Sequence, residues 1–358
     1  MSDGSSPEDS FRGRIRSYAE ILNPLFDPTP HMASDRLFEF VCTLVRAAGM
    51  QGPEWDPFYE SEAVLEDLTN LARLELPAER FPNPSRTRVR LALLSYCHLT
   101  EMDLPYALIA NLLQNRLGRK YDTEPFLDLM LPTSRKPQRR PRNIKPPSPT
   151  RKIGRIKELA GEAGLQSICD AFDSFYNSII RNAVSHSDYI LADGELRLTK
   201  ANWLSRTKGY ASPVVEWGEL IELVTDTFAF YNALFALYER CRKSFGVFQN
   251  AFLPFDAYYK GLLQLAFDEE QRLIGFRAYW PNGSLSEYTR SNKGSTGLNL
   301  DFNADRSMNF MVGEYASKPG TFSPLVEHDQ MPVYAEVPGT TLRPYWPNDL
   351  RIYKLIPK

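Results

Sequence analysis

The chain has 358 residues, of which 43% are hydrophobic and 24% are charged, and its formal net charge is −2. This length predicts about two domains with ordinary hydrophobic cores, and the composition is typical of a soluble globular protein. The near-neutral charge excludes a protein that is basic over its whole surface, so any RNA site has to be a local basic patch.

The cysteines point to a reduced, cytoplasmic protein. Cys42, Cys97, Cys169 and Cys241 are widely scattered, and no two have the spacing of a zinc site or a redox motif. We therefore expect buried thiols, no metal and no other cofactor. The N-terminal segment carries both charge signs, unlike a signal peptide, and no apolar run approaches the roughly 20 residues that span a bilayer. No membrane contact is expected.

Helical periodicity dominates the chain up to about residue 250, because apolar residues recur three and four positions apart. Proline-containing stretches separate the predicted helices. We expect a helical N-terminal extension at 1–83, followed by a helical bundle at 84–250. The first predicted helices cover residues 11–22, 34–48, 61–74, 85–101 and 105–117.

A basic, proline-rich loop is predicted at 132–152, within the bundle. Residues 134–152 contain five prolines and no acidic residue, which indicates an extended segment. Its charge could hold an RNA backbone; the alternative is a solvated linker, as charge runs usually are. Its position directly before the next helix favours binding. The basic residues are Arg135, Lys136, Arg139, Arg140, Arg142, Lys145, Arg151 and Lys152.

The next helix is predicted over 153–186, with an interruption near Gly161 and Gly164. Residues 189–191 and 196–198 then predict a small hairpin. A second long helix is expected over 214–245, and it is apolar on several sides. Such a helix should be buried, either inside the bundle or against a second subunit.

After about residue 250 the apolar pattern changes to period two, which predicts strands. We therefore expect a mainly α protein with a smaller β-rich C-terminal domain at 251–358. Glu327, His328 and Asp329 are adjacent, but three consecutive residues of a regular element cannot all face one ion. The strands are expected at 262–267, 273–280 and 284–289 as a meander, and at 308–314, 332–336 and 350–356.

The helix over 153–186 changes from apolar to polar at its end, where Arg181, Asn182 and His186 follow one another closely. If the helix continues, Asn182, His186 and Tyr189 lie on one stripe of its surface. Arg181 and His186 then lie roughly 140° apart. The guanidinium has to curl round, or the helix has to kink or fray, for both groups to reach one phosphate.

These three residue types suit RNA cleavage without a metal. Histidine exchanges protons near neutral pH, so His186 could take the proton from a ribose 2′-OH or give one to the leaving oxygen. Arg181 offers a planar set of donors that fits a phosphate, and Asn182 could orient either partner. An alternative is that His186 lies near a helix end and Arg181 pairs with Asp188 on a solvated face. We expect substrate contacts from Arg139, Arg140, Arg142, Ser185 and Tyr189.

The string Arg181-Asn182-x-x-x-His186 resembles the signature of the HEPN superfamily, which has Arg, four to six residues, and then His. The resemblance implies a helical bundle that dimerises, so that two motifs meet in one cleft and cut RNA, leaving a cyclic phosphate. It makes Arg181 and His186 the catalytic pair, with Asn182 in support. Some members have Tyr two residues after the His, whereas this chain has Asp188 there and Tyr189 next.

The function expected from motif and resemblance is a metal-independent endoribonuclease, acting in bacterial defence or in a toxin-type system. Its partners would be RNA, a second copy of the chain and a regulatory protein. The alternative is a non-catalytic HEPN-like module that binds RNA or protein. His98, with Glu101 beside it, could be a second base, but a histidine satisfied at the edge of the core is the stronger interpretation.

Overall fold

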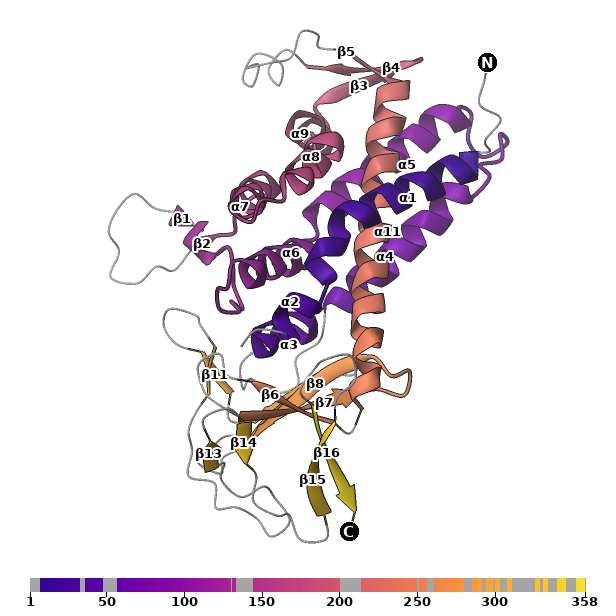
Figure 1. Cartoon of the computed structure of the whole chain (residues 1–358). Helices are drawn as coiled ribbons and strands as arrows, with labels where there is room; N and C mark the ends of the chain where they lie inside the picture. Colours follow the sequence, from indigo (N-terminus) through magenta and orange to yellow (C-terminus); the bar gives the residue numbers. More distant parts are fainter. Residues whose placement is uncertain are drawn as a thin grey trace. The chain divides into compact units, whose positions relative to one another are not determined.

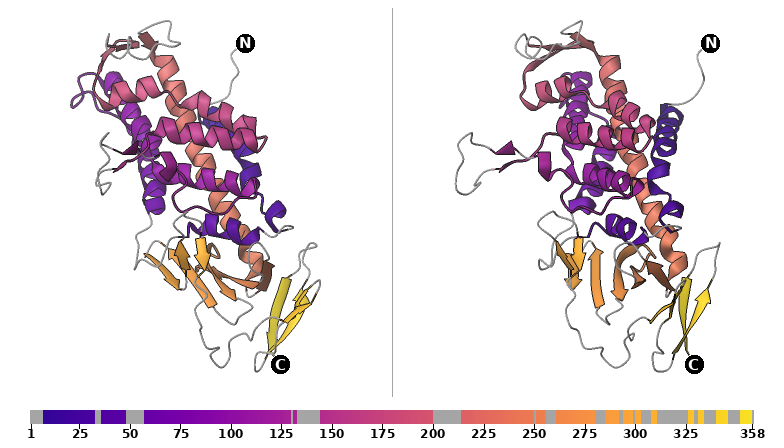
Figure 2. Two further views of the ribbon diagram at one scale, coloured as in Figure 1. Left: turned by 90° about the vertical axis from the view of Figure 1, so that its left-hand side faces the viewer. Right: turned by 60° about the vertical axis from the view of Figure 1, so that its left-hand side comes forward.

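The structure is a computed structural model and is mainly helical, as the sequence predicts, with most strands in the C-terminal part of the chain (Figure 1). The helices are coloured indigo to salmon and the later strands orange to yellow (Figure 2). The residues described are 7–32, 36–47, 57–129, 131–132, 144–199, 214–249, 251–255, 261–279, 285–291, 294–298, 300–302, 308–310, 326–328, 331–333, 340–345 and 352–357.

The chain forms two compact units, each assembled from separate stretches of sequence. Unit 1 comprises Met1–Pro24, Phe58–Tyr106 and Asp128–Ala236. Unit 2 comprises Leu25–Pro57, Ala107–Leu127 and Leu237–Lys358. The domain boundaries expected from the sequence, after residues 83 and 250, remain predictions.

The helices expected over 11–22, 61–74, 85–101 and 105–117 are confirmed, with ends shifted by a few residues. In the segment 34–48 the helix begins at Leu37, and residues 33–35 lie outside the described residues. These helices are α1 (Pro7–Leu22), α3 (Leu37–Val45), α4 (Pro57–Arg73), α5 (Pro84–Glu101) and α6 (Asp103–Arg116), and a short α2 covers Thr29–Met32.

The single helix expected over 153–186 is wrong, because the segment forms α7 (Pro149–Glu162), α8 (Gln166–Phe175) and α9 (Ser178–Ser185). The first break follows Gly164, whose φ of 70° lies in the left-handed region that glycine adopts without strain. The second break is at Asn177. Its side-chain oxygen accepts hydrogen bonds from the amides of Ile179 and Ile180, at 3.0 and 3.1 Å, and so starts a new helix.

The hairpin expected after this segment is confirmed. Strands β3 (Tyr189–Ala192) and β4 (Glu195–Leu198) pair antiparallel around Asp193 and Gly194, and β5 (Val214–Glu216) pairs with β4. The next helix, α11 (Trp217–Ser244), therefore begins three residues later than expected.

An aromatic core holds unit 1 together. The Phe175 and Phe230 rings lie 4.5 Å apart between centroids, and Phe172 packs against both. The buried hydroxyl of Tyr231 donates to that of Tyr106 at 3.2 Å, so the polar ends of these side chains are satisfied within the core. The apolar faces of α8 and α11 are thus buried against each other.

Residues Trp217–Phe248, which include α11, are long and apolar enough to cross a membrane by length and composition alone. However, 61% of the most apolar window is buried inside the protein. This burial is what the sequence predicts for a core helix.

In unit 2, helix α3 packs on an antiparallel sheet. The expected meander is confirmed in β7 (Gly261–Phe267), β8 (Leu273–Tyr279) and β9 (Leu285–Ser291). Phe38 of α3 meets Phe276 of β8 edge-on, with 5.1 Å between ring centroids. The sheet order is β10-β9-β8-β7-β6-β16-β15, which adds β6 (Ala251–Phe255), β10 (Gly294–Leu298), β15 (Thr340–Tyr345) and β16 (Ile352–Pro357). Short pairs join β11 (Leu300–Phe302) to β12 (Met308–Phe310) and β13 (Val326–His328) to β14 (Met331–Val333).

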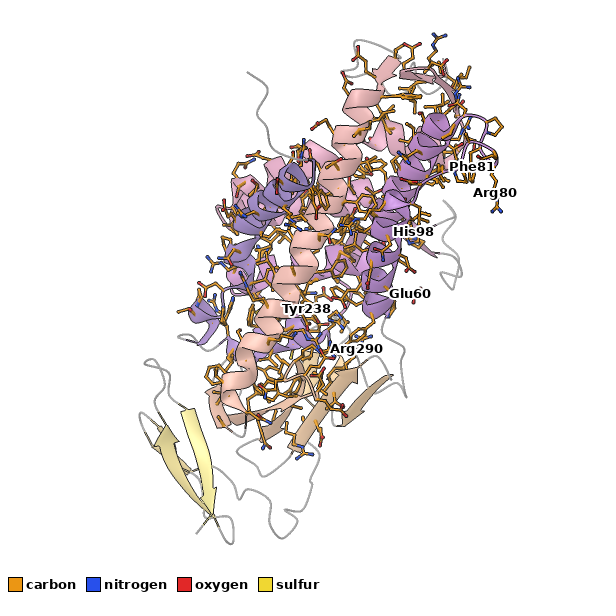
Figure 3. The ribbon with its side chains drawn as sticks, turned by 90° about the vertical axis from the view of Figure 1, so that its right-hand side faces the viewer. Glu60, Arg80, Phe81, His98, Tyr238 and Arg290 are labelled. Carbon is orange, nitrogen blue, oxygen red and sulfur yellow. The ribbon has the colours of Figure 1, made fainter. Side chains whose placement is uncertain are left out.

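The C-terminal end of α3 is closed by side chains from other parts of unit 2. The Tyr238 hydroxyl donates to the Leu44 carbonyl at 2.6 Å, and the Arg290 guanidinium donates to the Arg46 carbonyl at 2.5 Å (Figure 3). Arg46 and Arg242 each place a guanidinium 5.2 Å from the centroid of the Tyr238 ring. These contacts satisfy carbonyls that a helix end leaves free.

Two titratable side chains are buried in unit 2. The Glu39 carboxylate accepts the Tyr121 amide at 2.6 Å, and burial raises its pKa to about 7. His31 stacks on Phe40 with 4.4 Å between centroids, and burial lowers its pKa to about 4. Burial therefore favours the uncharged form of both side chains, at a cost in stability that depends on pH.

We predict that Glu39→Gln becomes more stable relative to the wild type as pH rises. Between about pH 4.5 and 7 the folded protein keeps a proton on Glu39 that the unfolded chain releases, so this group lowers the free energy of unfolding as pH increases. The variant lacks that penalty, which is roughly 3 kcal/mol. Melting temperatures of both proteins across this range measure the difference.

His31→Gln is the matched control with the opposite slope. The unfolded chain binds a proton on His31 between pH 6.5 and about 4, whereas the folded protein does not. The melting temperature of this variant relative to the wild type should therefore fall as pH rises from 4 to 6.5. A Glu39→Gln difference that is flat with pH would contradict the assignment of a buried, protonated carboxyl.

Candidate functional site

The motif lies on α9 and at its C-terminal end. The helix ends at Ser185, and His186 is the residue that follows it, with φ −100° and ψ 4°. Ser187 then has a φ of 53°, which turns the chain toward β3. The sequence predicted that both groups reach one phosphate only if the arginine curls round, or if the helix kinks or frays. The structure shows the helix ending before the histidine.

The stripe that would carry Tyr189 on a continued helix is therefore wrong, because Tyr189 begins β3. The His186 amide still donates to the Asn182 carbonyl, at 3.0 Å, so the last turn of α9 is closed. The side chains of Ser185 and His186 are exposed, and that of Tyr189 is half-buried. His186 can thus be reached from solvent.

Arg181 is held by two neighbours. Its guanidinium donates to the side-chain oxygen of Asn182 at 2.8 Å, and it forms an ion pair with the Glu101 carboxylate of α5. The arginine side chain is only 18% exposed, and its Nε is buried with no hydrogen-bond partner among the described residues. The two contacts use two of the five guanidinium N–H groups, and the Nε–H is a donor that lies below the surface.

The alternative interpretation of the motif predicted that a carboxylate pairs with Arg181, and it named Asp188. The carboxylate in the structure is Glu101, which sequence analysis considered only as a neighbour of His98. The spacing of residues along the chain could not predict this ion pair, because the two residues come from different helices.

A polar seam positions α9 on α5. The buried Tyr96 hydroxyl accepts the Asn177 amide at 2.8 Å and donates to the Asn177 carbonyl at 3.2 Å. One turn further along, the Cys97 thiol lies 3.6 Å from the Arg181 carbonyl. Burial raises the pKa of the Tyr96 hydroxyl, so it remains a protonated donor.

The Cys97 thiol also contacts the motif. Burial raises its pKa, while a hydrogen bond with Ser185 and the charge of Arg181 act in the opposite direction. Cys97 is thus a buried packing residue under α9 and not an activated nucleophile. Ser185 is turned toward this thiol as well as being exposed.

His98 is exposed on α5, and not satisfied at the edge of the core as expected. Figure 3 labels it on this helix. Its helix neighbour three residues on, Glu101, is the partner of Arg181. A solvent-facing histidine thus precedes the carboxylate by less than one turn.

The basic loop is described only at its ends. Strands β1 (Leu131–Pro132) and β2 (Ile144–Lys145) pair antiparallel, whereas Arg139, Arg140 and Arg142 lie outside the described residues. Their predicted contact with RNA stays a prediction.

Two later basic residues of this loop are already engaged. Lys152 is buried in an ion pair with Asp103, and the Arg151 guanidinium donates to the Leu129 carbonyl. The expectation that Lys152 holds an RNA backbone is therefore wrong, because its charge is neutralised inside unit 1.

No group of three or more metal-ligating side chains occurs within the part of the chain that the structure describes. All four cysteines are free and buried, as the sequence predicts. His328 lies in β13, and Asp329 falls outside the described residues. The arrangement on α9 therefore offers a proton carrier, a cation and an amide as its chemical groups.

Comparisons with protein-family models, curated proteins and solved structures found no match for this chain. The interpretation of the site consequently rests on the residues themselves and on the HEPN-like spacing of Arg181 and His186.

We predict that Tyr96→Phe loosens α9. Without the hydroxyl, the Asn177 amide loses its acceptor in a partly buried position, which costs about 1–2 kcal/mol. Asn177→Ala removes the N-cap and should cost about 1 kcal/mol. Hydrogen exchange of the α9 amides measures both effects.

Tyr18→Phe is the matched control, because its hydroxyl bonds the Ser174 hydroxyl of α8 at 2.8 Å and does not touch α9. This variant should leave the exchange of residues 178–186 unchanged. Equal protection of α9 in Tyr96→Phe and in the wild type would show that the seam does not position this helix.

Proposed function

We propose that this protein is a metal-independent endoribonuclease of the HEPN type. The observation that carries the proposal is an exposed His186 directly after α9, with Arg181 little more than one turn earlier and oriented by Asn182 at 2.8 Å. A histidine that solvent can reach thus follows, five residues along the chain, an arginine whose guanidinium is held by Asn182 and Glu101. This pairing suits attack of a ribose 2′-OH on its own phosphate.

In the proposed reaction His186 removes the proton from the 2′-OH, and the oxygen attacks the adjacent phosphorus. The bond from phosphorus to the 5′-oxygen breaks, and a proton from an imidazolium goes to that leaving oxygen. The products are a 2′,3′-cyclic phosphate and a 5′-hydroxyl. Arg181 stabilises the charge that grows on the phosphate oxygens, and Asn182 positions Arg181.

A second copy of the chain would supply the second imidazole, so that one acts as base and the other as acid. Ile190, four residues after His186 in β3, is 63% exposed. An apolar side chain beside the motif is suited to packing against that copy. The setting in bacterial defence or a toxin-type system, with a regulatory partner, rests on the family resemblance.

Glu101 bears directly on this proposal, because it already occupies the Arg181 guanidinium. A phosphate has to displace this carboxylate or share the arginine with it, through guanidinium N–H groups that neither Glu101 nor Asn182 accepts. The same ion pair favours the second candidate function, a non-catalytic module that binds RNA or protein and in which Arg181 is structural. The two candidate functions predict different effects of His186→Ala. In the nuclease it abolishes cleavage, whereas in the binding module it leaves binding unchanged.

We predict that purified protein cleaves total RNA in EDTA and that His186→Ala and Arg181→Ala each reduce the rate at least 100-fold, since each removes a catalytic group. Denaturing gels and end-group analysis measure cleavage and the cyclic phosphate. Arg90→Ala, which removes an exposed arginine elsewhere on α5, is the matched control and should cut at the wild-type rate.

Cleavage that both motif variants retain would overturn the nuclease proposal. RNA that is bound but not cut, with binding lost in Arg181→Ala and kept in His186→Ala, would instead establish the binding module. Growth after overexpression gives the same distinction in cells. An active nuclease should be toxic to the cell, and His186→Ala should remove that toxicity.

We predict that Glu101→Gln binds RNA more tightly than the wild type. The substitution keeps the side-chain shape but removes the charge that competes with phosphate for Arg181. A partly exposed ion pair contributes about 0.5–1 kcal/mol, so the gain should be roughly two- to fivefold. Both proteins carry His186→Ala, so that titration with labelled RNA measures affinity without cleavage. Weaker binding in the protein that also carries Glu101→Gln would show that Glu101 helps to form the site.

A further inference from the structure

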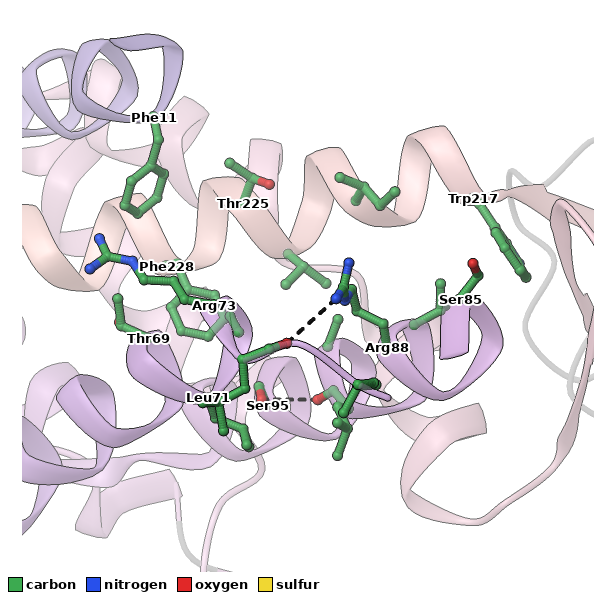
Figure 4. A pocket seen from close by; sticks show the side chains of 18 residues that line it. Phe11, Thr69, Leu71, Arg73, Ser85, Arg88, Ser95, Trp217, Thr225 and Phe228 are labelled. Atoms are coloured by element: carbon green, nitrogen blue, oxygen red, sulfur yellow. Dashed lines mark hydrogen bonds between the residues drawn. The ribbon is translucent and has the colours of Figure 1, made fainter. Parts of the chain in front are cut away.

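Unit 1 contains an open cavity of about 630 Å³ that lies apart from the motif residues in α9 (Figure 4). Its walls come from the end of α4 and the residues that follow it, from α5 between Ser85 and Ser95, and from the first half of α11, and Phe11 of α1 contributes at one side. A volume of this size is in the range of sites that hold small molecules.

The cavity leaves apolar side chains exposed. Leu74 and Ile221 are 56% and 54% exposed, and Leu71 is also exposed. These are three of the six large hydrophobic side chains exposed among the described residues, so the exposure is concentrated here. Covering such side chains is worth about 25 cal/mol for each Å² of apolar surface removed from water.

The polar groups of the lining are donors. Arg73 and Arg88 contribute exposed guanidiniums, and Arg88 makes only a long contact of 3.4 Å to the Leu74 carbonyl. The indole Nε1 of Trp217 is buried and has no hydrogen-bond partner within the described residues. A buried N–H without an acceptor is costly.

No aspartate or glutamate occurs among the described lining residues. The hydroxyls of Thr69 and Ser95 are engaged, because they donate to the carbonyls of Leu65 and Leu91 in their own helices. The cavity therefore combines an apolar floor with the positive charge of Arg73 and Arg88, and this combination fits an anion that has an apolar body.

We propose that this cavity binds a small amphiphile with one anionic head group and an apolar chain, of which a medium-chain carboxylate is the simplest example. The chain covers Leu71, Leu74 and Ile221. The head group accepts from the guanidinium of Arg88. The inference does not depend on the nuclease proposal, since it shares no residue with the motif.

The test compares three ten-carbon probes below their micelle-forming concentrations: decanoate, decan-1-ol and decyltrimethylammonium. Isothermal titration of the full chain should show one decanoate bound per chain. Decanol should bind roughly tenfold more weakly, because it lacks the charge-assisted hydrogen bonds. The cation should bind more weakly still.

Two variants and a control locate the site. Arg88→Gln should abolish the preference for decanoate over decanol, whereas Arg90→Gln, on the same helix but outside the lining, should keep it. Ile221→Glu puts a carboxylate at an exposed position of the cavity and should abolish decanoate binding without disturbing the fold. Circular dichroism checks each fold.

Equal affinity for the three probes, or an unchanged preference in Arg88→Gln, would overturn the proposal. The same holds if decanoate does not bind. If an acidic amphipathic peptide binds and decanoate does not, the cavity is a peptide-docking surface, and the small-molecule proposal fails.

Discussion

One buried hydroxyl determines where the motif lies. The Tyr96 side chain bonds both backbone groups of Asn177, and Asn177 in turn caps the first amides of α9. The start of α9 is thereby fixed on α5, and a rigid helix of eight residues carries that placement to its other end. Because Arg181 lies one turn along α9, it meets Glu101 and Cys97, and His186 falls where the helix stops.

Periodicity in the sequence predicted most of the helices, the meander and the hairpin at Asp193 and Gly194, since each is a local pattern. It missed the break at Asn177, because the apolar spacing continues across that residue while its side chain starts a new helix. The pair of Arg181 and Glu101 was missed for another reason. Spacing identifies which face of a helix is buried but not which neighbouring helix covers it.

The ion pair with Glu101 determines what else the Arg181 guanidinium can bind. A guanidinium that is mostly buried needs a partner, and Glu101 provides one. Glu101 is itself 42% exposed, so the pair is only partly shielded from water and contributes little to stability. Under the proposed function, the two non-bridging oxygens of an RNA phosphodiester would compete with Glu101 for the arginine, and Asn182 would keep the guanidinium in place while the partner changes.

Helix α5 belongs both to the cavity and to the support of the motif. Arg88 and Val89 in its first half line the cavity, whereas Tyr96, Cys97 and Glu101 in its second half contact the α8–α9 junction and α9. A shared rigid helix does not by itself couple two sites, because a ligand shifts an equilibrium only through different affinities for two states. An anionic amphiphile would therefore change the chemistry at His186 only if α5 has a second position, in which Glu101 no longer reaches Arg181.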